Sequence, residues 1–476
     1  MCRASGALLL VALLSAHARG DDDNGDDEGP RWGLAAVESA LVLGIPALSY
    51  YAFQDNSENY VLDWDWSSWE AKLDGSALRF DTDTWGYNTL KHPAFGVLMY
   101  RTGRSNNFGV WGSIGVTAVD TLVWEYVLEY REYPSINDMV VNVAAGVEIG
   151  EPLYQIAQLW RGGTMSAGDY VKSTLFSPIG TVNDVITHHV PRFRPVAWRS
   201  IVVEGGGLYR ELPDGHTRTE GLFTADIDLV ADRNYLSDGA SSGSIKPGSW
   251  SRIRGSLGTT DNLTSMRLSS RTTLAGRYAQ DDAGDGTMLG IGTAFSYRRD
   301  RFTSYWDHFA SMGILGPQLQ LSRRTPELAV RWDAAAYGDF AMVDAHVFAG
   351  EHPFPPAPPY ISSLQAQGYY YAYGATGTTR LRIETPALSI DLEGELHRLS
   401  QINDRDRVAV DTSAPMPETA HHNTDWRAYW RGELAFHYGQ WALGAEAEGS
   451  TLSGNWRTTT RTDSELAFGG FARADL

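Results

Sequence analysis

The sequence predicts a mainly β protein, a transmembrane antiparallel β-barrel of about 12 strands preceded by an N-terminal helical domain. Three observations predict this fold class. An apolar leader opens the chain, the second half alternates apolar and charged residues with a period of two, and turn-forming residues separate segments of about ten residues or more. Even strand numbers prevail in such barrels, which favours about 12.

Residues 1–18 have the pattern of a secretory signal peptide. Arg3 supplies the positive charge, residues 7–14 form an apolar core, and residues 16–18 form a small-residue cleavage site. Cys2, the single cysteine, precedes the apolar core, so it cannot be the lipidated residue of a lipoprotein. Together with the barrel pattern, the signal peptide predicts export to the bacterial outer membrane.

Residues 19–30 form an acidic segment that we interpret as a disordered linker, because like charges repel one another. The whole chain has a formal net charge of −19. Such a chain is a poor nucleic-acid binder, since phosphate contacts need clustered lysine and arginine. The aspartates lack the spacing and closing glutamate of an EF-hand, so no calcium site is predicted.

Residues 31–195 are predicted to form the helical domain, because they contain three apolar stretches of helical length. The first stretch is long enough to span a bilayer. Acidic side chains interrupt or flank the stretches, and each charge near a helix centre costs membrane insertion roughly 2.5–3.5 kcal/mol. We therefore expect these helices to pack against protein. The three stretches are residues 34–53, 110–128 and 139–149.

A short segment of this domain is predicted to be extended. Residues 71–74 and 78–81 alternate apolar and polar side chains on either side of Gly75 and Ser76, which are turn-forming residues. The segment is interpreted either as a short hairpin or as an early barrel strand.

The candidate functional residues lie in the middle of the helical domain, where ionisable groups occur in apolar sequence. On a helix, Glu125 and Glu129 fall one turn apart on a single face. Buried acids need partners. By residue type, the expected partners are Arg101, Arg104 and His92.

Ser135 and Asp138 have both a structural and a functional interpretation. In the structural one, Ser135 is a helix N-cap that accepts a hydrogen bond from the backbone of Asp138, whose acid suits the first helical turn. In the functional one, His92 is a general base and Glu125, Glu129 or Asp138 is an acid or a metal ligand. The sequence leaves both interpretations open.

The order of the motifs N-x3-HP-x2-G-x3-Y-x3-R, WEY-x2-E, PS-x2-D and GE resembles a family of bacterial envelope proteins described only as a domain of unknown function. The resemblance covers about residues 88–159 and implies an envelope location without supplying a reaction. Gly146 and Gly150 follow Asn142 on one helix face and would let a second helix approach closely. The other motif residues complete the set of Asn88, Pro93, Gly96, Tyr100, Arg104, Trp124, Asn142, Gly146, Gly150 and Glu151.

Residues 196–476 are predicted to form the barrel. Their alternation puts apolar side chains on one face of each strand and charged side chains on the other, which is typical of a barrel with lipid outside and water inside. The alternative is a soluble β-sandwich, whose polar face would have no reason to exceed ordinary surface charge. One departure is that the chain ends at Leu476, whereas such barrels usually end with an aromatic residue. Segments with the pattern include residues 223–229, 328–334, 388–395 and 426–437, and after a turn at Gly439 the pattern resumes from Trp441.

The predicted barrel has a lumen and one unusual loop. A barrel of this size is expected to enclose a lumen too wide for its own side chains to fill. The helical domain would then either occupy the lumen as a plug or lie beneath it in the periplasm. The proline-rich residues 353–359 cannot lie in a central strand, and they predict a long extracellular loop.

Two classes of function remain open. The sequence favours an outer-membrane structural or transport protein whose helical insert fills or gates the barrel. The alternative is an enzyme that modifies an envelope lipid with the cluster named above, but no G-x-S-x-G, H-E-x-x-H or glycine-rich phosphate motif supports it. We expect no cofactor and no metal. The expected partners are outer-membrane lipid and the barrel assembly machinery, and any small-molecule or lipid ligand is unknown.

Overall fold

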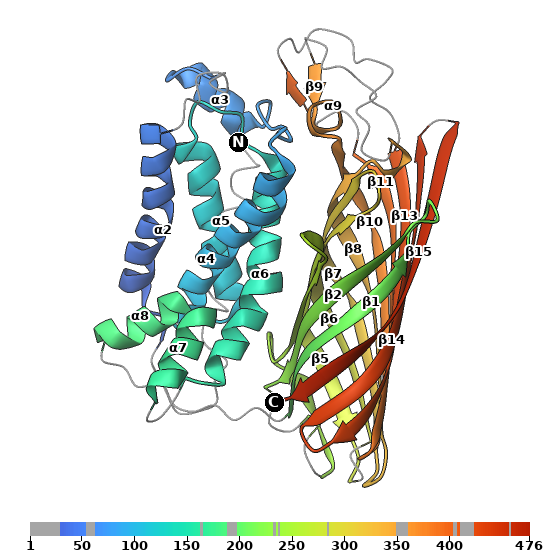
Figure 1. The fold of residues 1–476 in the computed structure, drawn as a ribbon. Coiled ribbons are helices and arrows are strands. Elements are labelled where there is room, and N and C mark those ends of the chain that lie inside the picture. Colours follow the sequence, from blue (N-terminus) through green and yellow to red (C-terminus); the bar gives the residue numbers. More distant parts are fainter. Residues whose placement is uncertain are drawn as a thin grey trace. The chain divides into compact units, whose positions relative to one another are not determined.

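The structure is a computed structural model in which the chain divides into two compact units, Met1–Arg194 and Pro195–Leu476 (Figure 1). We call them the helical unit and the barrel. The predicted signal peptide, residues 19–28 of the predicted linker and the proline-rich segment lie outside the described residues. The described residues are 29–53, 62–161, 165–187, 198–231, 235–236, 239–282, 285–348, 360–402, 407–409, 423–456 and 458–476.

The helical unit is a bundle in which α4, α5 and α6 pack against one another, with α2 against α4. Two single turns of π-helix, η1 and η2, interrupt it. Its elements are α2 (Trp32–Phe53), α3 (Trp66–Asp74), η1 (Tyr87–Lys91), α4 (His92–Ser105), α5 (Val110–Val123), η2 (Trp124–Leu128), α6 (Ile136–Gln158), α7 (Ala167–Phe176) and α8 (Pro178–Thr187).

Local capping signals determine where two of these helices begin. Ser135 is the N-cap of α6, and its Oγ accepts from the backbone N–H of Asp138 at 3.2 Å, as the sequence predicts. The extended segment predicted around residues 71–81 is wrong, because its first half forms the end of helix α3. Asp65 caps that helix by accepting from Ser68 N–H, and Gly75 ends it in the left-handed region at φ 83°.

Helices α4 and α6 pack with their backbones in contact. A Cβ added to Gly96 would lie 2.1 Å from the carbonyl oxygen of Asn142, and one added to Gly150 would lie 2.8 Å from the ring of Tyr100. Gly146 faces the carbonyl of Gly96. The small-residue stripe on α6 therefore permits the close approach that its spacing predicts.

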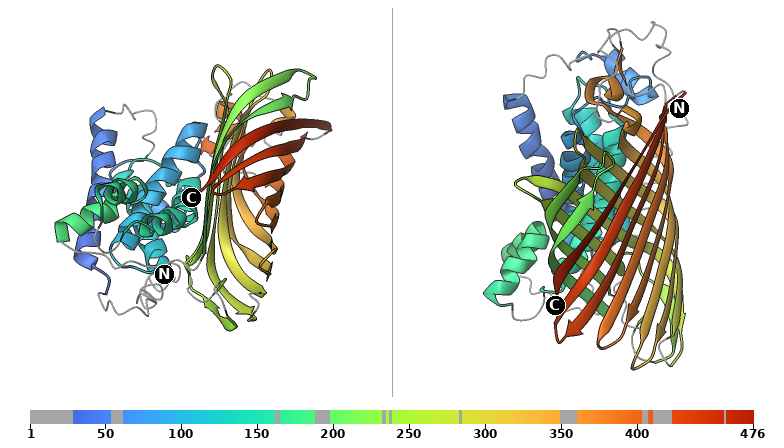
Figure 2. Two further views of the ribbon diagram at one scale, coloured as in Figure 1. Left: turned by 60° about the horizontal axis from the view of Figure 1, so that its bottom comes forward. Right: turned by 45° about the vertical axis from the view of Figure 1, so that its right-hand side comes forward.

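The second unit is a closed antiparallel barrel of twelve long strands among the described residues. Following the hydrogen-bonded neighbours, the ring runs β5-β4-β2-β1-β15-β14-β13-β11-β10-β8-β7-β6, and pairing of β5 with β6 closes it. The strands are strongly tilted (Figure 2). They are β1 (Trp198–Glu211), β2 (Thr217–Val230), β4 (Trp250–Thr259), β5 (Leu263–Gln280), β6 (Gly286–Arg301), β7 (Trp306–Arg324), β8 (Ala329–Asp344), β10 (Tyr369–Glu384), β11 (Leu388–Gln401), β13 (Asn423–Tyr438), β14 (Trp441–Trp456) and β15 (Thr459–Asp475).

Shorter elements extend the ring. Strand β3 (Ser241–Ile245) lengthens the pairing of β5, and β9 (Tyr360–Ser362) pairs with β12 (Arg407–Ala409). A turn of 3-10 helix, η3 (His346–Phe348), and a short helix, α9 (Ser363–Gln367), lie in the connection between β8 and β10.

The barrel is apolar outside and charged inside. On β2, Phe223 is 52% exposed whereas Asp226 is 5% exposed, and on β13 Trp430 is 47% exposed whereas Arg427 is fully buried. A water-soluble barrel or sandwich has the opposite arrangement. The alternation thus places apolar side chains outside and charged side chains inside, as the sequence predicts for a barrel surrounded by lipid.

Candidate functional site

Four of the five candidate residues of the helical unit lie together where α4 and α6 begin. His92 is the first residue of α4, and its Nε2 lies 3.4 Å from Oδ1 of Asp138 in the first turn of α6. The backbone N–H of Ser135 donates to Oε2 of Glu125 at 2.7 Å. The HP, WEY-x2-E and PS-x2-D motifs, which lie apart in the sequence, therefore meet through direct polar contacts.

The centre of this cluster is Asp81, a residue that the sequence analysis missed. Its carboxylate accepts from Nδ2 of Asn88 at 2.8 Å and from Nδ2 of Asn137 at 2.9 Å, and Ser135 Oγ lies 3.0 Å away. Asp81 comes from the segment that was interpreted as extended. Its position just before the first family motif is the signal that could have indicated it.

The prediction that Arg101, Arg104 and His92 are the basic partners of Glu125 and Glu129 is wrong. Lys72 of α3 donates from Nζ to the backbone carbonyls of both glutamates at 2.9 Å. Arg104 instead binds Glu151, whose Oε2 is 2.8 Å from its Nε, and Arg101 donates to the carbonyl of Phe176. The partner was missed because α3 was not predicted to be a helix and so was not placed near η2.

Burial controls the protonation of the cluster. It raises the pKa of Glu125 to about 8 and raises the pKa values of Glu129 and Asp138 well above their ordinary range, where neighbouring carboxylates raise them further. Burial also lowers the pKa of His92. Although burial opposes it, His92 and the amides of neighbouring asparagines hold the pKa of Asp81 below its ordinary value. At neutral pH burial therefore favours the protonated form of Glu125, whereas the contacts of Asp81 favour its ionised form.

The remaining motif residues join α4 to α6 and to the apolar core. Tyr100 Oη donates to Oε2 of Glu151 at 2.8 Å, next to the Arg104 contact. Trp124 packs with Leu43 and Met99 in a buried apolar cluster. Pro93 occupies the first turn of α4, where its missing N–H would have no intrahelical partner. These contacts support a structural role for the motif.

The cluster's chemistry is that of a hydrogen-bonded network. Asp138 contacts His92 and also accepts from Asn137 Nδ2 at 2.8 Å. Among the described residues, no three histidine, aspartate or glutamate side chains converge in a way that could hold a metal ion. The network links α4, α6 and η2 through direct contacts between their polar groups.

We expect Glu125→Gln to change the pH dependence of the helical unit's stability. The folded-state pKa of about 8 exceeds the ordinary value of 4.5, so the folded protein binds more protons than the unfolded one between these values. The parent therefore loses stability as pH rises through that window, by up to about 1.4 kcal/mol per pH unit from this group. Glutamine mimics the protonated acid and lacks this loss.

The measurement is the midpoint temperature of helix unfolding, read by far-ultraviolet circular dichroism of the full chain in detergent at pH 5 and pH 8. We expect the variant to match the parent at pH 5 and to exceed it at pH 8. Glu70→Gln, at an exposed position of α3, is the control and should follow the parent at both values. A variant that is equally destabilised at both pH values would show that Glu125 acts as a buried anion.

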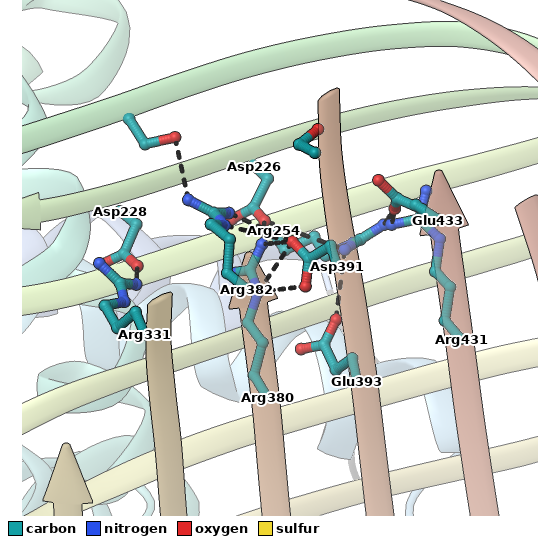
Figure 3. Close-up of polar contacts among 12 residues, drawn as sticks. Asp226, Asp228, Arg254, Arg331, Arg380, Arg382, Asp391, Glu393, Arg431 and Glu433 are labelled. Atoms are coloured by element: carbon teal, nitrogen blue, oxygen red, sulfur yellow. Dashed lines mark hydrogen bonds and ion pairs between the residues drawn. The ribbon is translucent and has the colours of Figure 1, made fainter. Parts of the chain in front are cut away.

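The barrel contains a second and larger set of ionisable groups, which fill its lumen. Arg380 of β10 binds Asp391 of the neighbouring β11 at 2.5 Å and also Asp226 of β2 at 3.0 Å (Figure 3). Arg252 and Arg254 of β4 bind Glu393 of β11 at 2.8 and 3.2 Å. The arginine side chains thus extend across the lumen.

These contacts connect opposite walls of the barrel. In a ring of twelve strands, two strands six positions apart face each other, and both β4 with β11 and β2 with β10 have this separation. Further ion pairs join strands that lie closer together around the ring. Arg267 of β5 is 2.8 Å from Glu448 of β14, and Arg298 of β6 is 2.9 Å from Glu395 of β11. The ion pairs form a layer across the lumen.

A cavity of about 150 Å³ remains within this layer. Arginines and serines of β4, β5 and β6 and glutamates of β11, β14 and β15 are among the residues that line it. Long arginines cross the lumen in ion pairs at this level, and the cavity is the space that their side chains leave unfilled. The sequence indicated a charged inner face but not which charges would pair.

One comparison with known proteins matches a segment of the helical unit. Residues 77–179 match the family model DUF3943, a domain of unknown function. No curated protein matches the chain.

Solved structures similar to this chain include three outer-membrane or autotransporter barrels. The beta domain of the Bordetella autotransporter Brka is 11% identical, with 58% of this chain and 99% of that chain covered and a TM-score of 0.22. The translocator domain of the autotransporter NalP from Neisseria meningitidis is also 11% identical, covering 58% and 88%, with a TM-score of 0.20. The TodX monoaromatic hydrocarbon channel is 7% identical, covering 60% and 91%, with a TM-score of 0.25.

At these scores the similarities add nothing to the argument, and the barrel rests on its own strand pairing. The predicted resemblance to a family of unknown function is confirmed, over residues 77–179. The chain thus combines a segment that matches DUF3943 with a closed twelve-stranded antiparallel barrel.

Proposed function

We propose that this protein is an outer-membrane transport barrel. The side chains in its own lumen hold it closed. The observation that carries the proposal is the layer of ion pairs joining opposite walls, β4 to β11 and β2 to β10. A small polar solute passes only when these pairs separate.

The apolar outer wall supports the membrane location. Exposed side chains such as Phe223, Leu392 and Trp430 would be costly in water over so large a surface, whereas a bilayer solvates them. The predicted signal peptide provides the export that an outer-membrane location needs.

The balance of charge in the lumen supports a closed transport path. Arginines of β4 and β5 face glutamates of β11 and β14, and a charged lining is typical of barrels that pass polar solutes. Here the opposite charges are in contact instead of lining an open channel. The gate is therefore the ion-pair layer of the barrel itself, in place of the helical insert that we expected from the sequence.

The helical unit's cluster supports a structural role for that unit. Asp81, Asn88, Ser135 and Asn137 use their polar groups on one another. Nothing in this arrangement favours the enzyme alternative.

The experiment is ion conductance of the purified full chain in planar lipid bilayers. The parent should insert and stay closed for most of the recording. Glu393→Gln removes the carboxylate that joins Arg252 and Arg254 to the opposite wall, and we expect it to open far more often. Glu393 suits this test because its side chain is 30% exposed, so its loss leaves the arginines in contact with water.

The control is Glu384→Gln, the same chemical change at the exposed end of β10, where the carboxylate is 3.7 Å from Arg382. It should behave like the parent. A parent that conducts as a wide, permanently open pore would contradict the proposal, and so would a Glu393→Gln variant that stays as closed as Glu384→Gln.

A further inference from the structure

Helix α2 has an exposed face without charge along its whole length. Val37, Leu41, Ile45 and Leu48 form a stripe at helical spacing on this face, each more than half exposed. The described exposed positions of the helix are all uncharged: Trp32, Gly33, Ala36, Val37, Ala40, Leu41, Ile45, Leu48, Ser49, Tyr51 and Ala52. A helix that faces water normally carries charged residues on its outer face.

Glu38 and Ser39 of α2 point the other way, into the helical unit. Glu38, its one charged residue, accepts from Nδ2 of Asn106 at 2.7 Å, and Ser39 Oγ donates to Asp120 at 2.8 Å. On the same inner side, Leu43 and Ala47 pack against Met99 and Trp124. The helix is thus polar inward and apolar outward, as the barrel wall is.

The dimensions and ends of α2 match a bilayer. Its 22 residues give a length of about 33 Å, close to the roughly 30 Å thickness of a hydrocarbon core. Trp32 lies at its start and Tyr51 near its end, both at least half exposed, and such aromatic residues prefer the two membrane interfaces. Among the described residues, α2 is the one helix long and apolar enough to cross a membrane.

We infer that the exposed face of α2 contacts the acyl chains of a lipid bilayer. The inference rests on the membrane location proposed above, because the chain that carries α2 continues into the barrel. It replaces our expectation that this apolar stretch would be covered by protein. Glu38 and Pro46 do not oppose lipid contact, because neither lies among the exposed positions.

Single-cysteine fluorescence tests the inference in the full chain. Cys2 is the only cysteine of the sequence, so a Cys2→Ser background leaves each introduced cysteine alone. Leu41→Cys and Ile45→Cys carry a polarity-sensitive probe on the exposed face of α2. The protein is reconstituted in phosphatidylethanolamine and phosphatidylglycerol vesicles, with nitroxide-labelled acyl chains as the lipid quencher and iodide as the aqueous quencher.

We expect the nitroxide lipids to quench both α2 probes several-fold more than iodide does. Glu70→Cys, on exposed α3, is the aqueous reference and should respond to iodide. Leu392→Cys, on the outer wall of β11, is the lipid reference. Quenching of the α2 probes by iodide alone would place the face in water. Quenching by neither agent would mean that protein covers it, and either result overturns the inference.

The lipid reference separates the two proposals. If the Leu392 probe responds to lipid and the α2 probes do not, the membrane location stands and the inference on α2 fails. If the Leu392 probe does not respond to lipid, the proposed location fails, whatever the α2 probes show.

Discussion

Arg210→Met is expected to destabilise the barrel by about 3–5 kcal/mol, the cost of removing one partner from a buried ion pair. Arg210 of β1 is almost completely buried and binds three carboxylates, those of Glu220, Glu448 and Glu465. Methionine is close in volume and leaves little cavity, so the loss arises from carboxylates left without their cation. A urea titration of the barrel in lipid vesicles measures it.

Arg323→Met is the matched control. The side chain of Arg323 is 77% exposed, and its contact with Asp285 spans 3.6 Å. Exposed pairs contribute about 0–1 kcal/mol, so this variant should unfold close to the parent. Adding Glu465→Gln to Arg210→Met should recover part of the loss by removing one orphaned charge. Equal stability of the two arginine variants would mean that lumen water replaces the lost cation.

Gly96→Val is expected to have the second largest effect, by separating α4 from α6. Even the first added carbon would lie 2.1 Å from the carbonyl oxygen of Asn142. That oxygen belongs to the backbone of α6, so no rotamer change can relieve the collision. Overpacking usually costs about 1–3 kcal/mol, and a collision with backbone belongs at or above the upper end of that range.

The measurement is thermal unfolding of the helical unit within the full chain, again by circular dichroism. Gly86→Ala is the control, because a Cβ there meets nothing within 4 Å and its φ of −66° suits alanine. We expect Gly86→Ala to unfold at or slightly above the parent's temperature. A Gly96→Val variant with the parent's midpoint would refute the close packing of α4 on α6.

The barrel could be predicted from the sequence because its signal repeats. Segments such as residues 223–229, 328–334 and 388–395 show the same alternation, and each side chain on them faces either the outside or the lumen. The N-cap at Ser135 was also predictable, since a cap is a local contact within one turn. Features that depend on neighbours in sequence could therefore be predicted.

The partners of the charged groups could not be predicted from sequence patterns. Arg380 and Asp226 are 154 residues apart, and nothing in either strand indicates that they meet. Lys72 and Asp81 were missed for a related reason. Their segment alternates like a strand over a few residues, but capping by Asp65 makes its first half a helix. Short alternating segments carry too little information to separate the two structures.

The cross-lumen ion pairs also bear on the order of events during assembly. Strands β4 and β11, or β2 and β10, are far apart along the ring, so strand-by-strand addition cannot satisfy their charges early. Until the first and last ring strands, β1 and β15, pair with each other, the groups that pair across the lumen lie apart on an open sheet, where water reaches them. Desolvation and pairing then occur together, which makes closure close to an all-or-none step and makes its rate sensitive to ionic strength.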